Sequence, residues 1–319
     1  MSSNDESRSA FERDVLAGLS ATPKHLSSKY FYDDEGSRLF QEIMALPEYY
    51  LTACETEIFT EQAGEIVNQL LAGGNAIDIV ELGAGDGVKT ALLLKELLSK
   101  DPSATYTPID ISEEAMAELA ENFRLKLPDL TIEPKIGDYF TILDQVRKSS
   151  QRRKAVLFLG SNIGNFDAER TASFFSSLRA VMNEGDLLFI GFDLQKDPRV
   201  IHRAYDDAGG VTARFNLNLL ERINRELGGN FIIDNFLHYA NYRPIEGSAR
   251  SYLISREFQK VEVAGREFTF EPWEPIFTEI SQKYTLSMIE RYATGAGFGV
   301  VTNFFDRRRY YCNSLWQPK

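Results

Sequence analysis

Hydrophobic and polar positions follow two alternating periods over the first two thirds of the chain. Short apolar runs of strand length are separated by segments whose apolar residues recur every three to four positions, as in an amphipathic helix. Strands that alternate with helices predict a parallel, doubly wound sheet. The expected strands cover 76–82, 105–110, 131–136, 155–160 and 186–192, and the expected helices cover 89–100, 113–126, 140–149 and 167–183.

This alternation stops after Asp193 and resumes near residue 285. In between, the segments are longer and richer in aromatic and amide side chains. We interpret 196–283 as an insertion that covers the site together with the N-terminal 50 residues. Strand-like stretches occur there at 249–255, 258–263 and 274–282, and N-terminal helices are expected at 8–22, 35–45 and 53–72. A helix over 285–295 and a strand hairpin are expected to end the chain.

The stretch Ile79–Thr90 is the most informative about function. A buried strand leads into Gly83, Gly85 and Gly87, which allow a tight turn and the close approach of a ligand. The helix that begins at Lys89 directs its first free N–H groups over this turn. The pattern predicts a nucleotide-binding turn, although a glycine turn between an ordinary strand and helix would look similar.

The charges around this turn indicate which nucleotide it binds. A dinucleotide fingerprint requires a small residue at position 88, which is Val88 here. Glu81, two residues before the first glycine, suits a cofactor that carries an ammonium and a sulfonium, and it opposes a pyrophosphate. Asp110 ends the next expected strand, where an acid holds a ribose hydroxyl in such folds. These features favour S-adenosylmethionine (SAM).

Other candidate ligand-binding residues are expected beyond the carboxyl ends of the strands, where ligands bind in such sheets. Asp138 could accept a hydrogen bond from an adenine amino group beside the ring of Tyr139, or it could cap the following helix. Asn162 and Asn165 could bind an amino-acid carboxylate or amine. Their alternative role is turn formation.

The segment 274–282 carries candidates for substrate binding. Regular alternation would place Phe277, Glu279 and Ser281 on one strand face. A carboxylate and a hydroxyl beside an aromatic ring could hold the N–H of a heterocycle. An exposed strand face would explain the same pattern.

Composition narrows the class of protein. The 319 residues, of which 43% are hydrophobic, suffice for one large or two ordinary domains. A net charge of −12 and a pI near 4.9 argue against a nucleic-acid partner. The dense basic clusters at 152–154 and 307–309 are interpreted as solvated turns. No segment resembles a membrane span or a signal peptide, so we expect a cytoplasmic protein. We also expect a monomer.

No metal site is expected. Cys54 and Cys312 lie far apart without metal-binding or redox spacing, so we expect them to be reduced and buried. The histidines, His25, His202 and His238, are interpreted as surface or packing residues.

Several motifs together resemble the L-histidine Nα-methyltransferases of the ergothioneine pathway. They are spread over nearly the whole chain, and in combination they are far more specific than the glycine turn. The motifs are Lys29-Tyr-Phe-Tyr-Asp33, Leu46-Pro-Glu-Tyr-Tyr50, the Glu-Leu-Gly-x-Gly turn, Phe158-Leu-Gly-Ser-Asn-Ile-Gly-Asn165, Ala204-Tyr-Asp-Asp-x-x-Gly-Val-Thr212, Phe215-Asn-x-Asn218, Asn224-Arg-Glu226 and Thr278-Glu-Ile-Ser-x-Lys283.

This resemblance implies SAM-dependent methylation of the histidine α-amino nitrogen, up to the trimethylated betaine. Asn165 and Tyr205 would hold the substrate carboxylate. The residues expected around the imidazole are Tyr49, Glu279 and Ser281. The residues expected to contact the cofactor are Gly83, Gly85, Lys89, Asp110, Asp138 and Tyr139, with Tyr32 near its amino-acid end.

The expected fold is α/β, a Rossmann-like class I SAM-dependent methyltransferase with a second, substrate-covering domain built from the N-terminus and the insertion. We assign 54–195 and 284–319 to the SAM-binding core, and 1–53 and 196–283 to the substrate-binding domain.

One departure from the family concerns the ring pocket. Its best-known members carry Ile-Glu-Met where this chain has Ala249-Arg-Ser251, so a serine replaces an apolar side chain expected against the imidazole. A second hypothesis is therefore an N-methyltransferase of another, aromatic amino acid. A third is a binding protein or oxidoreductase that uses the glycine turn for a different nucleotide.

Overall fold

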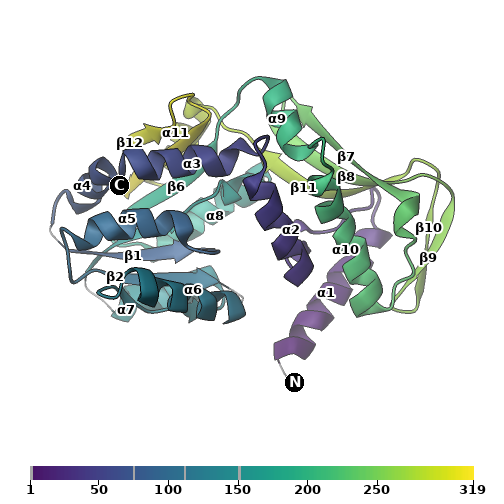
Figure 1. The fold of residues 1–319 in the computed structure, drawn as a ribbon, viewed down its shortest axis with the longest axis horizontal. Coiled ribbons are helices and arrows are strands. Elements are labelled where there is room, and N and C mark those ends of the chain that lie inside the picture. The colour runs from purple at the N-terminus through teal and green to yellow at the C-terminus, as the bar shows by residue number, and fades with distance from the viewer. Residues whose placement is uncertain (1–2, 75, 111–112, 150–151) are drawn as a thin grey trace. The chain divides into compact units, whose positions relative to one another are not determined.

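The computed structural model describes residues 3–74, 76–110, 113–149 and 152–319 (Figure 1). The chain divides into two compact units, each made of two separate stretches of sequence. The core unit comprises Leu51–Gln195 and Lys283–Lys319, and the insert unit comprises Met1–Tyr50 and Lys196–Gln282. Each unit has its own apolar core.

The core unit is built on a mixed sheet, which has eight strands within the described residues. Its strands are β1 (Ile77–Leu82), β2 (Thr105–Asp110), β3 (Thr131–Ile132), β4 (Lys135–Ile136), β5 (Arg153–Phe158), β6 (Leu187–Asp193), β12 (Phe298–Phe305) and β13 (Tyr311–Pro318). They lie in the order β12-β13-β6-β5-β1-β2-β3, with β4 also beside β2. The predicted terminal hairpin is present, and β13 joins β6 antiparallel.

The strand order reverses between β1 and β5, because the chain runs from β1 outward to β3 and then returns to the other side of β1. In open α/β sheets, ligands bind beyond the carboxyl ends of the strands at such a reversal. The turns after Leu82 and after Phe158 are therefore the two segments that flank the expected ligand position.

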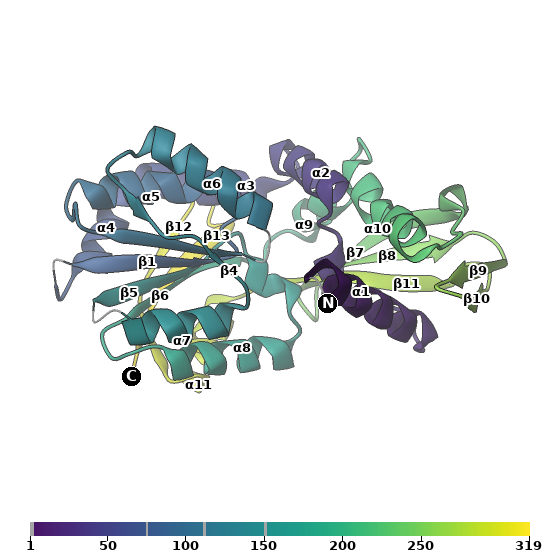
Figure 2. The same ribbon diagram turned by 90° about the horizontal axis from the view of Figure 1, so that it is seen from below.

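Helices cover both faces of this sheet (Figure 2). On one face lie α3 (Tyr50–Glu61), α4 (Ala63–Leu71), α5 (Val88–Leu98) and α6 (Glu113–Lys126), and on the other lie α7 (Tyr139–Ser149), α8 (Ala168–Val181) and α11 (Leu286–Gly295). The helix predicted over 53–72 is divided at Gln62, whose backbone leaves the helical region. Its side chain donates to the Phe305 carbonyl at 2.8 Å.

The insert unit combines antiparallel strands with helices. A three-stranded sheet in the order β11-β8-β7 is accompanied by the hairpin β9-β10. The elements are α1 (Ser3–Ser20), α2 (Asp34–Ala45), α9 (Pro198–Tyr205), α10 (Val211–Leu227), β7 (Phe236–Arg243), β8 (Ser248–Ser255), β9 (Gln259–Val263), β10 (Arg266–Phe270) and β11 (Pro275–Gln282). The apolar face of α10, which includes Leu219 and Ile223, shares a core with Phe11 and Val15 of α1.

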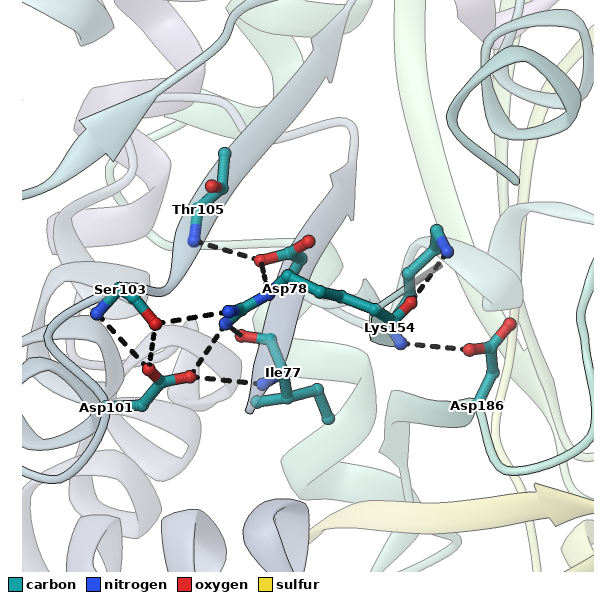
Figure 3. A network of polar contacts seen from close by, with 8 residues as sticks. Ile77, Asp78, Asp101, Ser103, Thr105, Lys154 and Asp186 are labelled. Atoms are coloured by element: carbon teal, nitrogen blue, oxygen red, sulfur yellow. Dashed lines mark hydrogen bonds and ion pairs between the residues drawn. The ribbon is translucent and has the colours of Figure 1, made fainter. Parts of the chain in front are cut away.

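The basic run 152–154 has a different role from the solvated turn predicted for it. Arg152 bridges two carboxylates at the amino edge of the core sheet, Asp78 at 2.9 Å and Asp101 at 2.8 Å. Both acids are labelled in Figure 3. Lys154 lies within β5 and is buried, and its backbone N–H donates to Asp186 at 2.9 Å. The acids are largely buried, so they require compensating donors.

Both cysteines are buried, unpaired thiols. Burial raises the pKa of Cys54 to about 12 and keeps its thiol protonated. Within the described ranges, no three His, Cys, Asp or Glu side chains are grouped so that they could hold a metal ion. No helix in the same ranges has both the length and the apolar character that a membrane span requires.

Candidate functional site

The glycine turn follows β1 as predicted, and all three of its glycines have left-handed backbones. The φ angles of Gly83, Gly85 and Gly87 are 70°, 55° and 65°, a region that other residues enter only with strain. A Cβ atom on Gly83 would lie 2.9 Å from the Tyr139 hydroxyl, and one on Gly87 would lie 2.5 Å from the Phe123 ring. Side chains at these positions would therefore collide with their neighbours.

Further predicted cofactor contacts gather around the end of β2 and the start of α7. Burial, together with the nearby carboxylates of Asp110 and Asp138, raises the pKa of Tyr139 to about 12. Asp138 accepts hydrogen bonds from both the backbone N–H and the hydroxyl of Thr141, each at 2.9 Å. The helix-capping role is thus present, and the contact with adenine stays a prediction.

Glu81 is buried beneath the turn and both of its carboxylate oxygens have hydroxyl partners. Thr90 donates to Oε1 at 2.8 Å and Tyr106 donates to Oε2 at 2.5 Å. Burial raises the pKa of Glu81 to about 7, above an ordinary value of 4.5, because it disfavours the charged form more than the two hydroxyls and the Lys89 ammonium favour it. Thr90 and Tyr106 lack any sequence signal, since their role depends on Glu81 pointing inward.

Lys89 lies in the first turn of α5, and its ammonium pairs with the carboxylate of Glu55 on α3. Sequence reasoning identified Lys89 but missed Glu55. The pattern around Glu55 is that of an ordinary amphipathic helix, and nothing in it distinguishes this acid from Glu57 or Glu61.

The turn after β5 contains the predicted asparagines. Gly160 and Ser161 both have left-handed φ angles, 71° and 58°, and the strain at Ser161 is of the kind found at functional sites. Ser161 is held in place by the backbone N–H of Asp193, which donates to its hydroxyl at 3.0 Å. Asn162 and Asn165 begin and end the short 3₁₀ helix that follows.

In the insert unit, a β-bulge changes the predicted strand face. The register between β11 and β8 shifts between Phe277 and Glu279, so that Phe277 pairs with Tyr252 while Glu279 pairs with Ser251. Adjacent residues of a strand point to opposite faces. Phe277 is therefore on the opposite face from Glu279, next to the ring of Tyr252 at 5.6 Å, and its predicted place beside Glu279 was wrong.

Glu279 and Ser281 do share a face, and polar partners surround them. The buried hydroxyl of Tyr205 donates to Ser281 Oγ at 2.7 Å. Ser251, which is 1% exposed, lies opposite Glu279 with its Oγ 3.5 Å from Oε2. The departure from the family at Ser251 thus falls within this polar group.

The bulge has a specific anchor. Its extra residue, Thr278, is buried and donates from its hydroxyl to Asn216 Oδ1 at 3.0 Å. Asn216 in turn donates to the Thr212 carbonyl within α10 at 3.1 Å. The motif residue Asn216 therefore holds the extra residue of the bulge that precedes Glu279 and Ser281.

Tyr32 and Tyr49 both contact the ring of Phe40, at 5.4 Å and 6.1 Å between centroids. Enclosure of the Tyr32 hydroxyl raises its pKa, and the neighbouring Glu279 and Tyr205 raise it further, although the residue keeps 46% of its surface exposed. The structure thus brings Tyr32, predicted for the cofactor, close to residues predicted for the substrate.

Comparison with known proteins identifies the class. A family model described as histidine-specific methyltransferase, SAM-dependent, matches residues 11–318, which include parts of both units. The chain belongs to this family. The α/β core with its mixed sheet and additional strands is accordingly a methyltransferase fold, and SAM is the methyl donor of the family.

Three relatives agree with this assignment. The chain is 36% identical to histidine N-alpha-methyltransferase of Mycobacterium tuberculosis over 92% of this chain and 90% of that protein. It is 38% identical to histidine N-alpha-methyltransferase of Mycolicibacterium smegmatis over 88% of this chain and 86% of that protein. Ergothioneine biosynthesis protein 1 of Schizosaccharomyces pombe is 32% identical over 81% of this chain, which corresponds to 34% of that longer protein.

Replacement of Glu81 by Gln should stabilise the ligand-free protein increasingly as the pH rises. The native state holds the Glu81 proton more tightly than the unfolded state does. The contribution of Glu81 to the free energy of unfolding is therefore complete below its unfolded pKa and is lost as the pH rises through about 7. Each unit of pKa difference corresponds to about 1.4 kcal/mol. Thermal unfolding at about pH 5 and about pH 8 should show a higher melting temperature for Glu81→Gln than for the parent only at the higher pH. The exposed control Glu65→Gln should show no such difference.

Substitution of Thr278 by Val should weaken both the bulge and substrate binding. The buried Asn216 oxygen would lose its partner, at a cost of about 1–3 kcal/mol, while the shape of the side chain is kept. We expect a lower melting temperature and a higher KM for the amino acid, with unchanged affinity for S-adenosylhomocysteine. Thr269→Val, at an exposed position of β10, is the matched control; unchanged kinetics in Thr278→Val would contradict the anchoring role.

Proposed function

We propose that this chain transfers methyl groups from SAM to the α-amino nitrogen of L-histidine, up to the trimethylated betaine. The observation that carries the proposal is the family match over residues 11–318, because it includes both the glycine turn and the polar face of β11. The names of the two mycobacterial relatives support the α-nitrogen as the acceptor. The name of the fission yeast relative supports a place in ergothioneine formation.

The core unit, close to our sequence assignment of 54–195 and 284–319, is proposed to bind SAM. The bare backbone of the glycine turn suits the close approach of a nucleoside, and Lys89 offers a cation for the only anionic group of SAM, its carboxylate. Glu81 beneath the turn suits the positive charges of the ligand. The proposed contacts are Gly83, Gly85, Lys89, Asp110, Asp138 and Tyr139, with Tyr32 near the amino-acid end of SAM.

The insert unit, close to 1–53 and 196–283, is proposed to bind the amino acid. Glu279 and Ser281 are the proposed acceptor and donor for the two imidazole nitrogens, and Tyr49 is proposed to add an aromatic surface. The Tyr205 hydroxyl donates to Ser281 Oγ at 2.7 Å and would turn to donate to the substrate carboxylate, because a carboxylate only accepts hydrogen bonds. Asn165 and Tyr205 are the proposed contacts of the substrate carboxylate.

The chemistry requires mainly placement by the protein. SAM, when bound, supplies a methyl group on a sulfonium, which an amine can accept without a covalent enzyme intermediate. The side chains therefore act by orienting the amine and excluding water, which can account for most of the acceleration in such reactions. Tyrosine faces can hold the growing cationic nitrogen by cation–π attraction, worth about 0.5–2 kcal/mol each. We further propose a cytoplasmic monomer, with which two buried, unpaired cysteines are consistent.

Mass spectrometry of the products tests the proposed function directly. The purified protein, incubated with SAM and L-histidine, should yield species with one, two and three added methyl groups on the α-nitrogen. Histidinamide should be a poor substrate, since it lacks the carboxylate. Methylation of phenylalanine in preference to histidine would instead favour the second hypothesis, an enzyme for another aromatic amino acid.

Replacement of Glu279 by Ala tests the ring contact. The imidazole N–H would lose its buried acceptor, at a cost of about 1–3 kcal/mol. The kcat/KM for histidine should therefore fall roughly ten- to hundredfold. The affinity for S-adenosylhomocysteine should not change. Glu271→Ala, an exposed acid of the same unit, is the control, and retention of full histidine turnover in Glu279→Ala would remove histidine as the preferred substrate.

A further inference from the structure

Glu55 is a fully buried carboxylate that receives donors from separate segments of the core unit. Its Oε2 accepts the Lys89 ammonium and, at 3.0 Å, the Gly160 N–H. Its Oε1 accepts the Tyr311 hydroxyl at 3.0 Å and the Asn313 amide at 2.9 Å. A buried carboxylate with this many donors is held in a fixed position.

The sheet leaves room for this carboxylate at one position. A Cβ atom on Gly191, in the middle of β6, would lie 2.6 Å from Glu55 Oε1 and would also collide with the Tyr311 hydroxyl. Glycine weakens the interior of a strand and often marks the close approach of another group. The presence of glycine in this buried strand is explained by the Tyr311 hydroxyl and the Glu55 carboxylate that accepts from it, which together occupy the space of a side chain.

Two of the donors belong to the segments that flank the reversal of strand order. Lys89 follows the glycine turn after β1, and Gly160 lies in the turn after β5. These strands are neighbours in the sheet. Glu55 therefore connects the two turns between which ligands bind in folds of this kind.

Among the donors to Glu55, the side chain of Lys89 is affected most by being held in place. A lysine side chain samples many rotamers in water and loses that freedom when it binds an anion. Here the ammonium is tethered to Glu55, yet 23% of the side chain remains exposed. An ammonium has three donors, and Glu55 uses one of them, so the remaining N–H groups can bind an anionic ligand from a fixed position.

We propose that Glu55 is a positioning residue for the amino-acid portion of the cofactor, which it serves by holding Lys89 and the Gly160 N–H in place. The inference rests on the proposed function, in which Lys89 contacts SAM. The partner of Lys89 is the carboxylate of that ligand, because it is the ligand's only anionic group. Glu55 itself does not touch the cofactor.

Calorimetric titration with two ligands tests this role. S-adenosylhomocysteine carries the amino-acid portion, whereas 5′-methylthioadenosine shares the adenosine and thioether but lacks it. In Glu55→Gln and in Lys89→Met, the Kd for S-adenosylhomocysteine should rise roughly tenfold. The double variant should lose little more affinity than either single variant, because both substitutions disrupt the same interaction. The Kd for 5′-methylthioadenosine should stay within about twofold of the parent value.

Controls separate positioning from a purely structural role. Glu57→Gln on the same helix, where the side chain accepts the Arg307 N–H at 2.7 Å, should bind both ligands like the parent. Glu55→Asp keeps the charge but withdraws it from Lys89, so it should weaken the binding of S-adenosylhomocysteine and not that of 5′-methylthioadenosine. If Glu55→Gln does not fold, the Glu55→Asp variant distinguishes positioning from a structural role. An equal loss of affinity for both ligands, or no loss of affinity for either, would overturn the inference. A parent protein that binds neither ligand would overturn the proposed function itself.

Discussion

Carboxylates buried at the carboxyl edge of the core sheet constrain the rest of this unit, because each must be surrounded by donors to remain below the surface. Glu55 and Glu81 draw on hydroxyls, amides and an ammonium from distant segments. Asp193, at the end of β6, forms a fully buried ion pair with Lys283 at 2.8 Å. Since Lys283 and Tyr311 belong to the last part of the chain, satisfying these acids requires the C-terminal hairpin to be in place.

The Asp193–Lys283 pair also lies beside the points where the inserted segment begins and ends. The chain leaves the core unit after Gln195 and returns at Lys283. Around the ion pair, the Tyr284 N–H donates to the Asp193 carbonyl at 2.8 Å and the Gln195 N–H donates to the Tyr284 carbonyl at 2.9 Å. The exit and the return are thus joined within the core unit, so an insertion of this length leaves the sheet's hydrogen bonding intact.

The parallel strands and the glycine turn were predictable because their signals are local: apolar runs of strand length, and glycines at alternate positions. The face of β11 was only partly predictable. Regular alternation correctly places Glu279 with Ser281 but wrongly adds Phe277, because the bulge depends on Thr278 reaching Asn216 in another element. Glu55 illustrates the same limit, since an acid on an amphipathic helix gives no sign of donors that lie far away in the sequence.

The discontinuity of the insert unit has a consequence for synthesis on the ribosome. The apolar residues of α1, such as Phe11 and Val15, complete their core with Phe215 and Leu219 of α10. Those partners emerge some two hundred residues later, after the central strands of the core sheet have been made. During that interval the N-terminal helix can pack only against nearby residues of its own stretch, such as Tyr30, whose ring lies 4.5 Å from that of Phe11. The part of its apolar surface that α10 covers later stays exposed on the nascent chain, as a surface of the kind that chaperones bind.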